Sequence, residues 1–200
     1  MRKYNISDDF NHLIKIMTNK NFLECRILCN EIPFFIADYA IEQEDAEKKM
    51  ISQLIKKLDS LDVKVLELNI YDTIIEILKQ TGDWEWYINN ESQMDKNRFQ
   101  KDLQNILDIN DCMLPHIEEK INSNKYDILF LTDIGAVYPY IRSHLLISVF
   151  SSVIKNKPIV MFYPGTYEQT STLGATFNLF NKFEEGREYK AANIFEIQGE

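Results

Sequence analysis

The sequence predicts an α/β protein in three layers, with one open, mostly parallel sheet of about five strands and helices on both faces. Short apolar runs typical of buried strands alternate with longer segments whose apolar residues recur at helical spacing. The clearest strands are residues 128–132 and 159–163, and a helical pattern lies between them. These segments predict a parallel βαβ unit. We expect a single domain over residues 1–200, with a helical insertion over about 71–124 between the second and third strands.

The elements before the insertion follow from their periodicity. Residues 8–24 carry an amphipathic helical pattern, and Pro33 opens the first strand at 33–37, because proline is tolerated at a strand start. Residues 43–61 predict the clearest helix, with acidic residues near its start and lysines near its end, as the helix dipole favours. Residues 63–68 alternate only in part, which predicts a strand nearer the sheet edge.

The insertion is helical with a break at residues 81–83. An aromatic cluster follows the break: Trp84, Trp86 and Tyr87. Such a cluster forms either a small local core or a surface that docks a partner, since interfaces are rich in exposed aromatic residues. Asp111 is expected to cap a further helix, with Pro115 in its first turn.

The last elements complete the βαβ unit. A strand at 126–132 is followed by a helix at 139–155 with a proline in its first turn, and by a strand at 158–163. Pro164-Gly165 predicts a type II turn at the end of that strand, and Gly165 lets the backbone approach a neighbour closely. Residues 192–197 are a candidate for a short final strand.

Composition restricts the class of protein. The 200 residues carry a net charge of −9, which disfavours nucleic-acid binding and an anionic membrane surface, since dedicated binders carry a basic stripe. The odd number of cysteines, Cys25, Cys29 and Cys112, predicts no disulfide framework, and a zinc site on the first two would need two more ligands. No apolar run has the length of a membrane span, and we expect a cytoplasmic protein.

Familiar catalytic motifs are absent from the sequence. It contains no G-x-x-x-x-G-K-[ST] phosphate loop, no G-x-G-x-x-G dinucleotide fingerprint, no G-x-S-x-G elbow and no H-E-x-x-H zinc motif. We therefore assign no catalytic residue, and we expect no metal and no cofactor.

Polar residues do gather after the predicted strands, where open α/β sheets bind ligands. Arg142 is expected in the first turn of a helix, where the macrodipole disfavours a cation, so it needs a carboxylate or a bound anion nearby. With His144 and the free helix amides, Arg142 could form an anion pocket. The alternative is an ion pair between Arg142 and Asp133, Asp38 or Glu31.

Two carboxylates form a second candidate group. Asp38 and Asp133 each follow a predicted strand, and we expect the first and third strands to be adjacent, which would bring both carboxylates to the ligand edge. They could hold Mg²⁺ through several waters, or cap the helices that follow. Gly165 and the hydroxyl of Tyr167 would lie at the same edge.

Several motifs together carry a resemblance over most of the chain. They are Phe22-Leu23 with Asn30-Glu31-Ile32-Pro33-Phe34, Leu129-Phe130-Leu131-Thr132 with Pro139-Tyr140-Ile141-Arg142-Ser143-His144, Phe162-Tyr163-Pro164-Gly165 with Leu179-Phe180, and Tyr189-Lys190-Ala191. Lys190 stands where an arginine is expected, and it would bind a ligand without bidentate geometry. In combination these motifs resemble the BrxB family of the bacteriophage-exclusion (BREX) defence systems.

The resemblance implies a role in phage defence, and it does not imply a particular reaction. BREX systems methylate host DNA and block phage replication, and the family is expected to work in a complex with other BREX proteins, above all PglZ, the alkaline-phosphatase-like component. No catalytic residues can be carried over from the family. We therefore expect a non-enzymatic assembly factor whose docking surface includes Trp84, Trp86 and Tyr87, or the loop edge around Arg142 and Tyr167.

Other readings stay open at this point. The alternative function is an anion- or nucleotide-binding sensor or enzyme on a degenerate nucleotide-binding-type fold, with a pocket of Asp38, Asp133, Arg142 and His144. Direct nucleic-acid binding is disfavoured by charge, and the sequence leaves a homodimer open.

Overall fold

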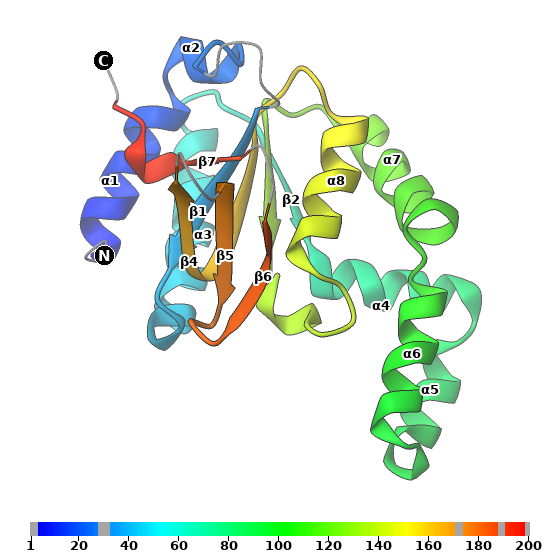
Figure 1. Cartoon of the computed structure of the whole chain (residues 1–200). Coiled ribbons are helices and arrows are strands. Elements are labelled where there is room, and N and C mark those ends of the chain that lie inside the picture. Colours follow the sequence, from blue (N-terminus) through cyan, green and yellow to red (C-terminus); the bar gives the residue numbers. More distant parts are fainter. Residues whose placement is uncertain (1–3, 28–32, 171–173, 188–190, 199–200) are drawn as a thin grey trace.

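The computed structural model describes residues 4–27, 33–170, 174–187 and 191–198. Within these residues, seven strands form one mixed sheet with helices on both faces, which confirms the α/β class (Figure 1). The strands are β1 (Phe34–Tyr39), β2 (Val65–Asn69), β3 (Ile128–Thr132), β4 (Ile159–Thr170), β5 (Gly174–Leu179), β6 (Phe183–Arg187) and β7 (Ala192–Asn193). The helices are α1 (Ile6–Met17), α2 (Lys20–Leu23), α3 (Glu44–Asp59), α4 (Ile70–Thr81), α5 (Trp84–Asn90), α6 (Lys96–Ile106), α7 (Leu114–Ser123) and α8 (Ser143–Val153).

Five of the strands are parallel and lie in the order β2-β3-β4-β1-β7. The edge position predicted for residues 63–68 is confirmed, because β2 is the last strand on its side. The expected adjacency of the first and third strands is wrong, because β4 lies between β1 and β3. A central strand must be apolar on both faces, and the first part of β4 is completely buried on both; the pattern of a single strand does not reveal which neighbours it takes.

β4 does not end where a turn was predicted. It runs for 12 residues through Pro164-Gly165, and its second half pairs antiparallel with β5, which in turn pairs with β6. The predicted type II turn is therefore wrong, but the close approach at Gly165 is confirmed. Gly165 has φ +145°, and a Cβ atom there would lie 2.2 Å from the carbonyl oxygen of Asn178. Only glycine fits this close contact between the backbones of two paired strands.

Two helices begin later than the sequence suggested. α8 begins at Ser143, and Arg142 before it is extended, with φ −99° and ψ 146°. Pro139 is therefore outside the helix, and Arg142 occupies its N-cap position instead of its first turn. α7 has Pro115 in its first turn as predicted, but Asp111 does not cap it, because that residue lies within a π-helical turn that precedes α7.

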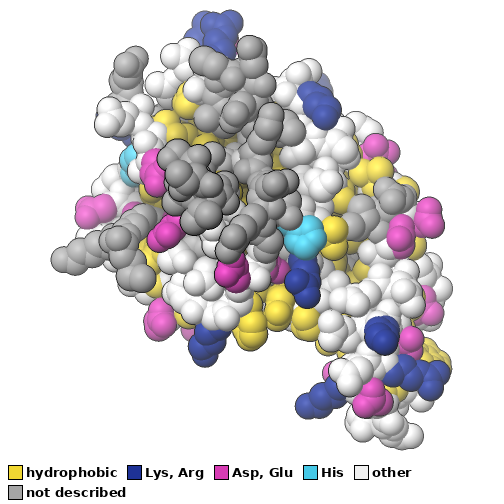
Figure 2. Space-filling view, in the orientation of Figure 1, with side chains coloured by type: hydrophobic (Ala, Val, Ile, Leu, Met, Phe, Trp, Pro, Cys, Tyr) yellow, Lys and Arg dark blue, Asp and Glu magenta, His cyan; other side chains and the backbone are white. Residues whose placement is uncertain are grey.

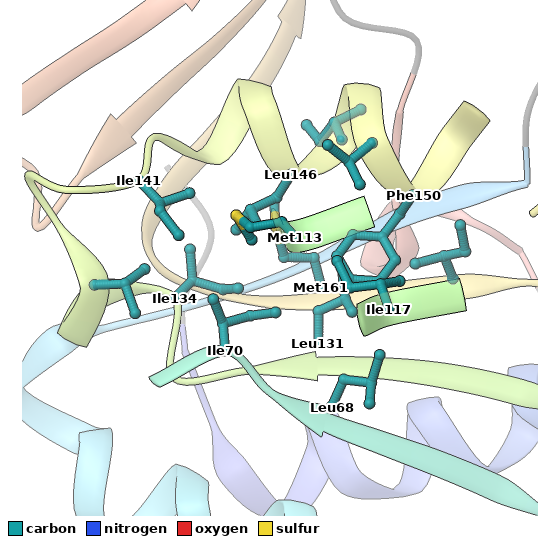
Figure 3. Packing of buried hydrophobic residues seen from close by; sticks show 14 of the residues in the cluster. Leu68, Ile70, Met113, Ile117, Leu131, Ile134, Ile141, Leu146, Phe150 and Met161 are labelled. Atoms are coloured by element: carbon teal, nitrogen blue, oxygen red, sulfur yellow. The ribbon is translucent and has the colours of Figure 1, made fainter. Parts of the chain in front are cut away.

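Each face of the sheet has its own core, because successive side chains of a strand point to opposite sides. One core joins the sheet to α4, α7 and α8, and Figure 3 shows how its side chains interdigitate. Its labelled members are Leu68, Ile70, Met113, Ile117, Leu131, Ile134, Ile141, Leu146, Phe150 and Met161. The other core packs α1 and α3 against the opposite face, with the alternate residues of β1, β3 and β4.

The segment between β2 and β3 is helical. Its break falls at Gly82, which ends α4 in the left-handed conformation with φ +82°, as C-terminal glycines commonly do. Beyond the break, α5 and α6 extend away from the sheet as an arm (Figure 1). No helix in the described ranges has both the length and the apolar character needed to span a bilayer.

Candidate functional site

Asp38 is buried within β1, because that strand runs two residues further than predicted. The hydroxyl of Tyr4 donates to Oδ2 of Asp38 and to the carbonyl oxygen of Gly165, each at 3.2 Å. Nδ2 of Asn193 donates to Oδ1 of Asp38 at 3.2 Å and to the carbonyl oxygen of Tyr167 at 3.4 Å. The structure thus brings three predicted site residues together, in a network that ties the first helix region, β1, β4 and β7.

The Tyr167 side chain is turned inward. It is 2% exposed, its hydroxyl donates to the carbonyl oxygen of Ala191, and its ring lies 4.6 Å from that of Phe177. The expectation that this hydroxyl is presented at the loop edge is therefore wrong. A long β4 carries Tyr167 into the packed region under β5, which an early strand end would not have done.

Asp133 lies in a different place, directly after β3. Its Oδ1 forms an ion pair with Nζ of Lys48 on α3 at 2.7 Å, and its Oδ2 accepts a hydrogen bond from Nδ2 of Asn69 at 2.6 Å. The backbone of Asp133 has φ +55°, a conformation that aspartate adopts more readily than most residues. The pocket around this pair has a volume of about 150 Å³ and is lined by Tyr39, Lys48, Ile51, Ser52, Glu67, Asn69, Thr132, Asp133 and Phe162.

The electrostatics of this pocket are dominated by acidic groups. The hydrogen bond with Asp133 is the main cause that raises the pKa of Lys48, so its ammonium is held as a structural cation. Burial raises the pKa of Tyr39, and the negative charges of Glu44, Glu47 and Asp133 raise it further. A pocket of this kind favours a small cation or a neutral donor over an anionic ligand.

Asp38 and Asp133 do not form the expected pair. β4 lies between their strands, and strand alternation places Asp38 on the α8 face, whereas Asp133 contacts α3 on the other face. In the part of the chain that the structure describes, no three His, Cys, Asp or Glu side chains lie close enough to hold a metal ion. Cys25 and Cys112 are free thiols, and Cys29 lies outside the described residues.

Arg142 and His144 lie at the start of α8. Arg142 is exposed and forms no ion pair with any described residue; Asp133 pairs instead with Lys48, so the expected pairing to either aspartate is not formed, and Glu31 lies outside the described residues. Burial lowers the pKa of His144, the charge of Glu185 opposes this effect, and Arg142 lowers the pKa further. His144 is therefore neutral at pH 7 and adds no positive charge to an anion pocket.

The aromatic cluster of the arm is partly a local core. Tyr87 is buried, and its ring contacts those of Trp86 and Phe99 edge-to-face at 5.1 and 5.5 Å. Phe99 in turn contacts Tyr140 at 6.0 Å, in the loop before α8. Trp84 is half-buried and packs on the large core. These contacts fix the arm to the loop that follows β3.

Two large apolar side chains of the arm stay exposed. Trp86 is 50% exposed and Ile88 is 53% exposed, and Ile88 lines a groove between the arm and the β3–α8 loop. The groove has a volume of about 700 Å³ and is lined by Ile88, Glu91, Ser92, Met94, Lys96, Phe99, Gln100, Pro139 and Tyr140. In the view of Figure 2, acidic and basic side chains are interspersed over this projecting part, with hydrophobic side chains between them.

Sequence reasoning missed several residues of these sites. Lys48 was not singled out in the sequence, although it pairs with Asp133 directly after β3. Glu185 was missed because residues 183–187 were not predicted as a strand; an acidic residue that alternates with Phe183 would have been a signal for a buried carboxylate. Asn193 caps the 3-10 turn that follows β7, and asparagine is a residue that commonly caps such a turn, so its capping role could have been predicted.

Comparison with known proteins now identifies the family. The family described as BREX protein BrxB matches residues 66–194, which is more than half of the chain. A BREX protein BrxB of Bacillus cereus (strain H3081.97) is 29% identical over 196 residues, which cover 96% of this chain and 98% of that protein. A BREX protein BrxB of Escherichia coli O9:H4 (strain HS) is 31% identical over 138 residues, covering 69% and 68%. No solved structure matches the chain.

The matched region contains nearly all of β2, β3 to β7, the arm, Asp133 and the start of α8, whereas Lys48 and the other α3 residues of the Asp133 pocket precede it. The match to the Bacillus protein extends over nearly the whole chain. The chain belongs to the BrxB family of BREX proteins.

Proposed function

We propose that this protein is a non-enzymatic component of a BREX anti-phage defence complex and acts as an interaction factor that docks PglZ. Membership of the family supports the pathway. The observation that carries the docking role is the exposure of two large apolar side chains of the arm: Trp86 and Ile88 are each about half exposed, and Ile88 lines a groove of mixed polar and apolar character. Large exposed apolar side chains beside a groove are typical of interfaces.

The geometry suits a docking surface because it is rigid. The rings of Trp86, Tyr87, Phe99 and Tyr140 form a continuous series of edge-to-face contacts, so the arm is braced against the body. A partner then loses little free energy in ordering the surface that it binds. Arg142 follows Tyr140 by two residues and is exposed, so it can extend the same surface with a cation.

The structure separates two tryptophans that the sequence treated together. Trp84 packs on the core, so its removal damages the fold, whereas Trp86 is the exposed anchor. A variant that carries both substitutions would confuse loss of binding with loss of stability. The docking test therefore uses Trp86→Ala and Ile88→Ala, with Trp84 left intact.

The test is gel filtration with light scattering of this protein and its cognate PglZ at micromolar concentration. We expect the wild-type protein to co-elute, and Trp86→Ala and Arg142→Glu to weaken the complex. Leu61→Ala is the matched control, because Leu61 is 44% exposed and lies in the turn between α3 and β2, away from the arm. Clean separation of the wild-type proteins would contradict PglZ as the partner, and equal co-elution of all variants would contradict this docking surface.

The alternative, an anion- or nucleotide-binding sensor, has weaker support. The pocket around Asp133 has about 150 Å³, below the roughly 300–1,000 Å³ of drug-sized ligand sites, and its charge is mostly negative. A thermal-shift screen of nucleotides with Mg²⁺ tests it, since a ligand at 100 times its Kd stabilises by about 2.7 kcal/mol. A clear shift would favour the sensor over the docking role.

A further inference from the structure

Glu185 is a buried carboxylate without a hydrogen-bonding partner. It lies on β6, its side chain is among the least exposed of the acidic residues at 1%, and neither oxygen accepts a hydrogen bond within the described chain. Buried charges in proteins are normally paired or bound to a metal, because an isolated one loses its hydration without compensation. Glu185 therefore needs an explanation that the fold of the described residues does not supply.

The surroundings of Glu185 are aromatic and polar. The β5–β6 register places it opposite Phe177, whose ring lies 5.2 Å from that of Tyr163. β6 packs against α8, close to the helix start (Figure 1). Burial raises the pKa of Tyr163 and the charge of Glu185 raises it further; Ser143 partly counteracts this, although the two hydroxyls are not in hydrogen-bonding geometry.

Among the side chains that the structure describes, no nearby cation or dipole compensates Glu185. Arg142 is exposed and pairs with no described residue, and His144 is neutral at pH 7 because its pKa is lowered. The positive end of the α8 dipole favours a carboxylate near Ser143, but this interaction is weak compared with a direct ion pair. The site thus holds a carboxyl group whose two free oxygens could both bind one planar donor.

An exposed aromatic side chain lies near Glu185 on the same strand. Phe183 lies two residues before Glu185 and so shares its face of β6, and it is 44% exposed. The ring of Tyr138 stacks on Phe183 at 5.1 Å with an interplanar angle of 28°. Such rings favour the stem and the planar head of an arginine-like group.

We propose that Glu185 is the receptor for a guanidinium group, which its two free oxygens bind as a bidentate pair beside the rings of Tyr163, Phe177 and Phe183. Two sources carry this chemistry: an arginine side chain of a partner protein and a free guanidinium metabolite. The inference does not rest on the docking role of Trp86, because it is argued from Glu185 and the side chains around it.

The first test needs no ligand. If Glu185 is uncompensated in the free protein, Glu185→Gln removes a buried charge and raises the urea midpoint of unfolding. Glu168→Gln is the matched control on an exposed glutamate of β4, and it should leave the midpoint unchanged. A lower midpoint for Glu185→Gln would show a structural partner inside the chain and would overturn the proposal.

The second test uses N-acetyl-arginine amide as the probe and the isosteric, neutral N-acetyl-citrulline amide as the control ligand. NMR of protein labelled with ¹³C at the glutamate Cδ should show a shift of the Glu185 signal with the arginine amide only. Glu185→Gln should weaken this binding by about tenfold or more, as expected for loss of a charge-assisted pair. The same response in the citrulline titration would overturn the guanidinium assignment.

The third test separates the sources. If the guanidinium belongs to a protein, Glu185→Gln should weaken co-elution with PglZ, and an excess of the arginine amide should compete. If it belongs to a metabolite, the amide binds while co-elution is unchanged. The proposal is wrong if the amide does not bind and Glu185→Gln leaves the complex unchanged. It is also wrong if Lys190→Gln shifts the Glu185 signal as strongly as the amide does.

Discussion

Among the described glycines Gly82, Gly135 and Gly165, substitution by alanine should destabilise the protein most at Gly165. Gly165 has φ +145°, which costs a residue with a side chain about 1–3 kcal/mol. The added Cβ would also lie 2.2 Å from the carbonyl oxygen of Asn178, which is backbone and cannot rotate away. Separating β4 from β5 to relieve this contact costs about 1–3 kcal/mol more. We therefore expect a loss of about 4 kcal/mol in the free energy of unfolding.

Gly82→Ala is the matched control because it shares the positive φ but not the contact. Gly82 has φ +82°, and a Cβ there would meet nothing within 4 Å, so only the conformational cost of about 1 kcal/mol applies. Urea unfolding followed by far-ultraviolet circular dichroism measures both variants. If the two variants differ by less than about 1 kcal/mol in their free energy of unfolding, the reasoning that the pairing of β4 with β5 excludes a side chain at Gly165 is refuted.

Three further predictions follow from single contacts. Because the pKa of His144 is lowered from 6.5 in the folded state, the unfolded chain binds the proton more readily; stability should fall as pH decreases below about 6.5, and His144→Gln should remove that component, as urea midpoints across pH would show. Tyr4→Phe removes a donor to buried Asp38 and should cost about 1–3 kcal/mol in urea unfolding, without changing the far-ultraviolet spectrum. Trp84→Ala should lower the thermal midpoint while Trp86→Ala leaves it nearly unchanged, since only Trp84 packs on the core.

The sequence was most informative where one local signal decides the structure. The helix expected at 43–61 is α3, Glu44–Asp59, because its apolar stripe and its terminal charges agree. The break at Gly82 is also local, since a helix that ends in the left-handed conformation needs a residue without Cβ. In these positions the physical cause lies within a few residues of its effect.

The sequence was less informative where distant segments decide. Strand order depends on which apolar faces meet, and nothing in β1 or β3 shows that β4 will lie between them. The Pro164-Gly165 pair has the composition of a turn, but the pairing of Gly165 with Leu179 keeps the chain extended. Asp38, Gly165 and Tyr167 do come together, but they do so through Tyr4 and Asn193, which no sequence pattern groups with them.

The long β4 explains why the predicted ligand edge is mostly occupied by the protein itself. In a parallel α/β sheet, a ligand usually lies beyond the carboxyl ends of the strands. Here β4 continues past that edge and pairs with β5 and β6, which pack Phe177 and Tyr167 onto the α8 side of the sheet. The Tyr4–Asp38–Asn193 network closes the same side, and a pocket of about 150 Å³ remains at the edge on the α3 side. The docking proposal therefore places partner recognition outside this filled edge, on the exposed apolar side chains of the arm.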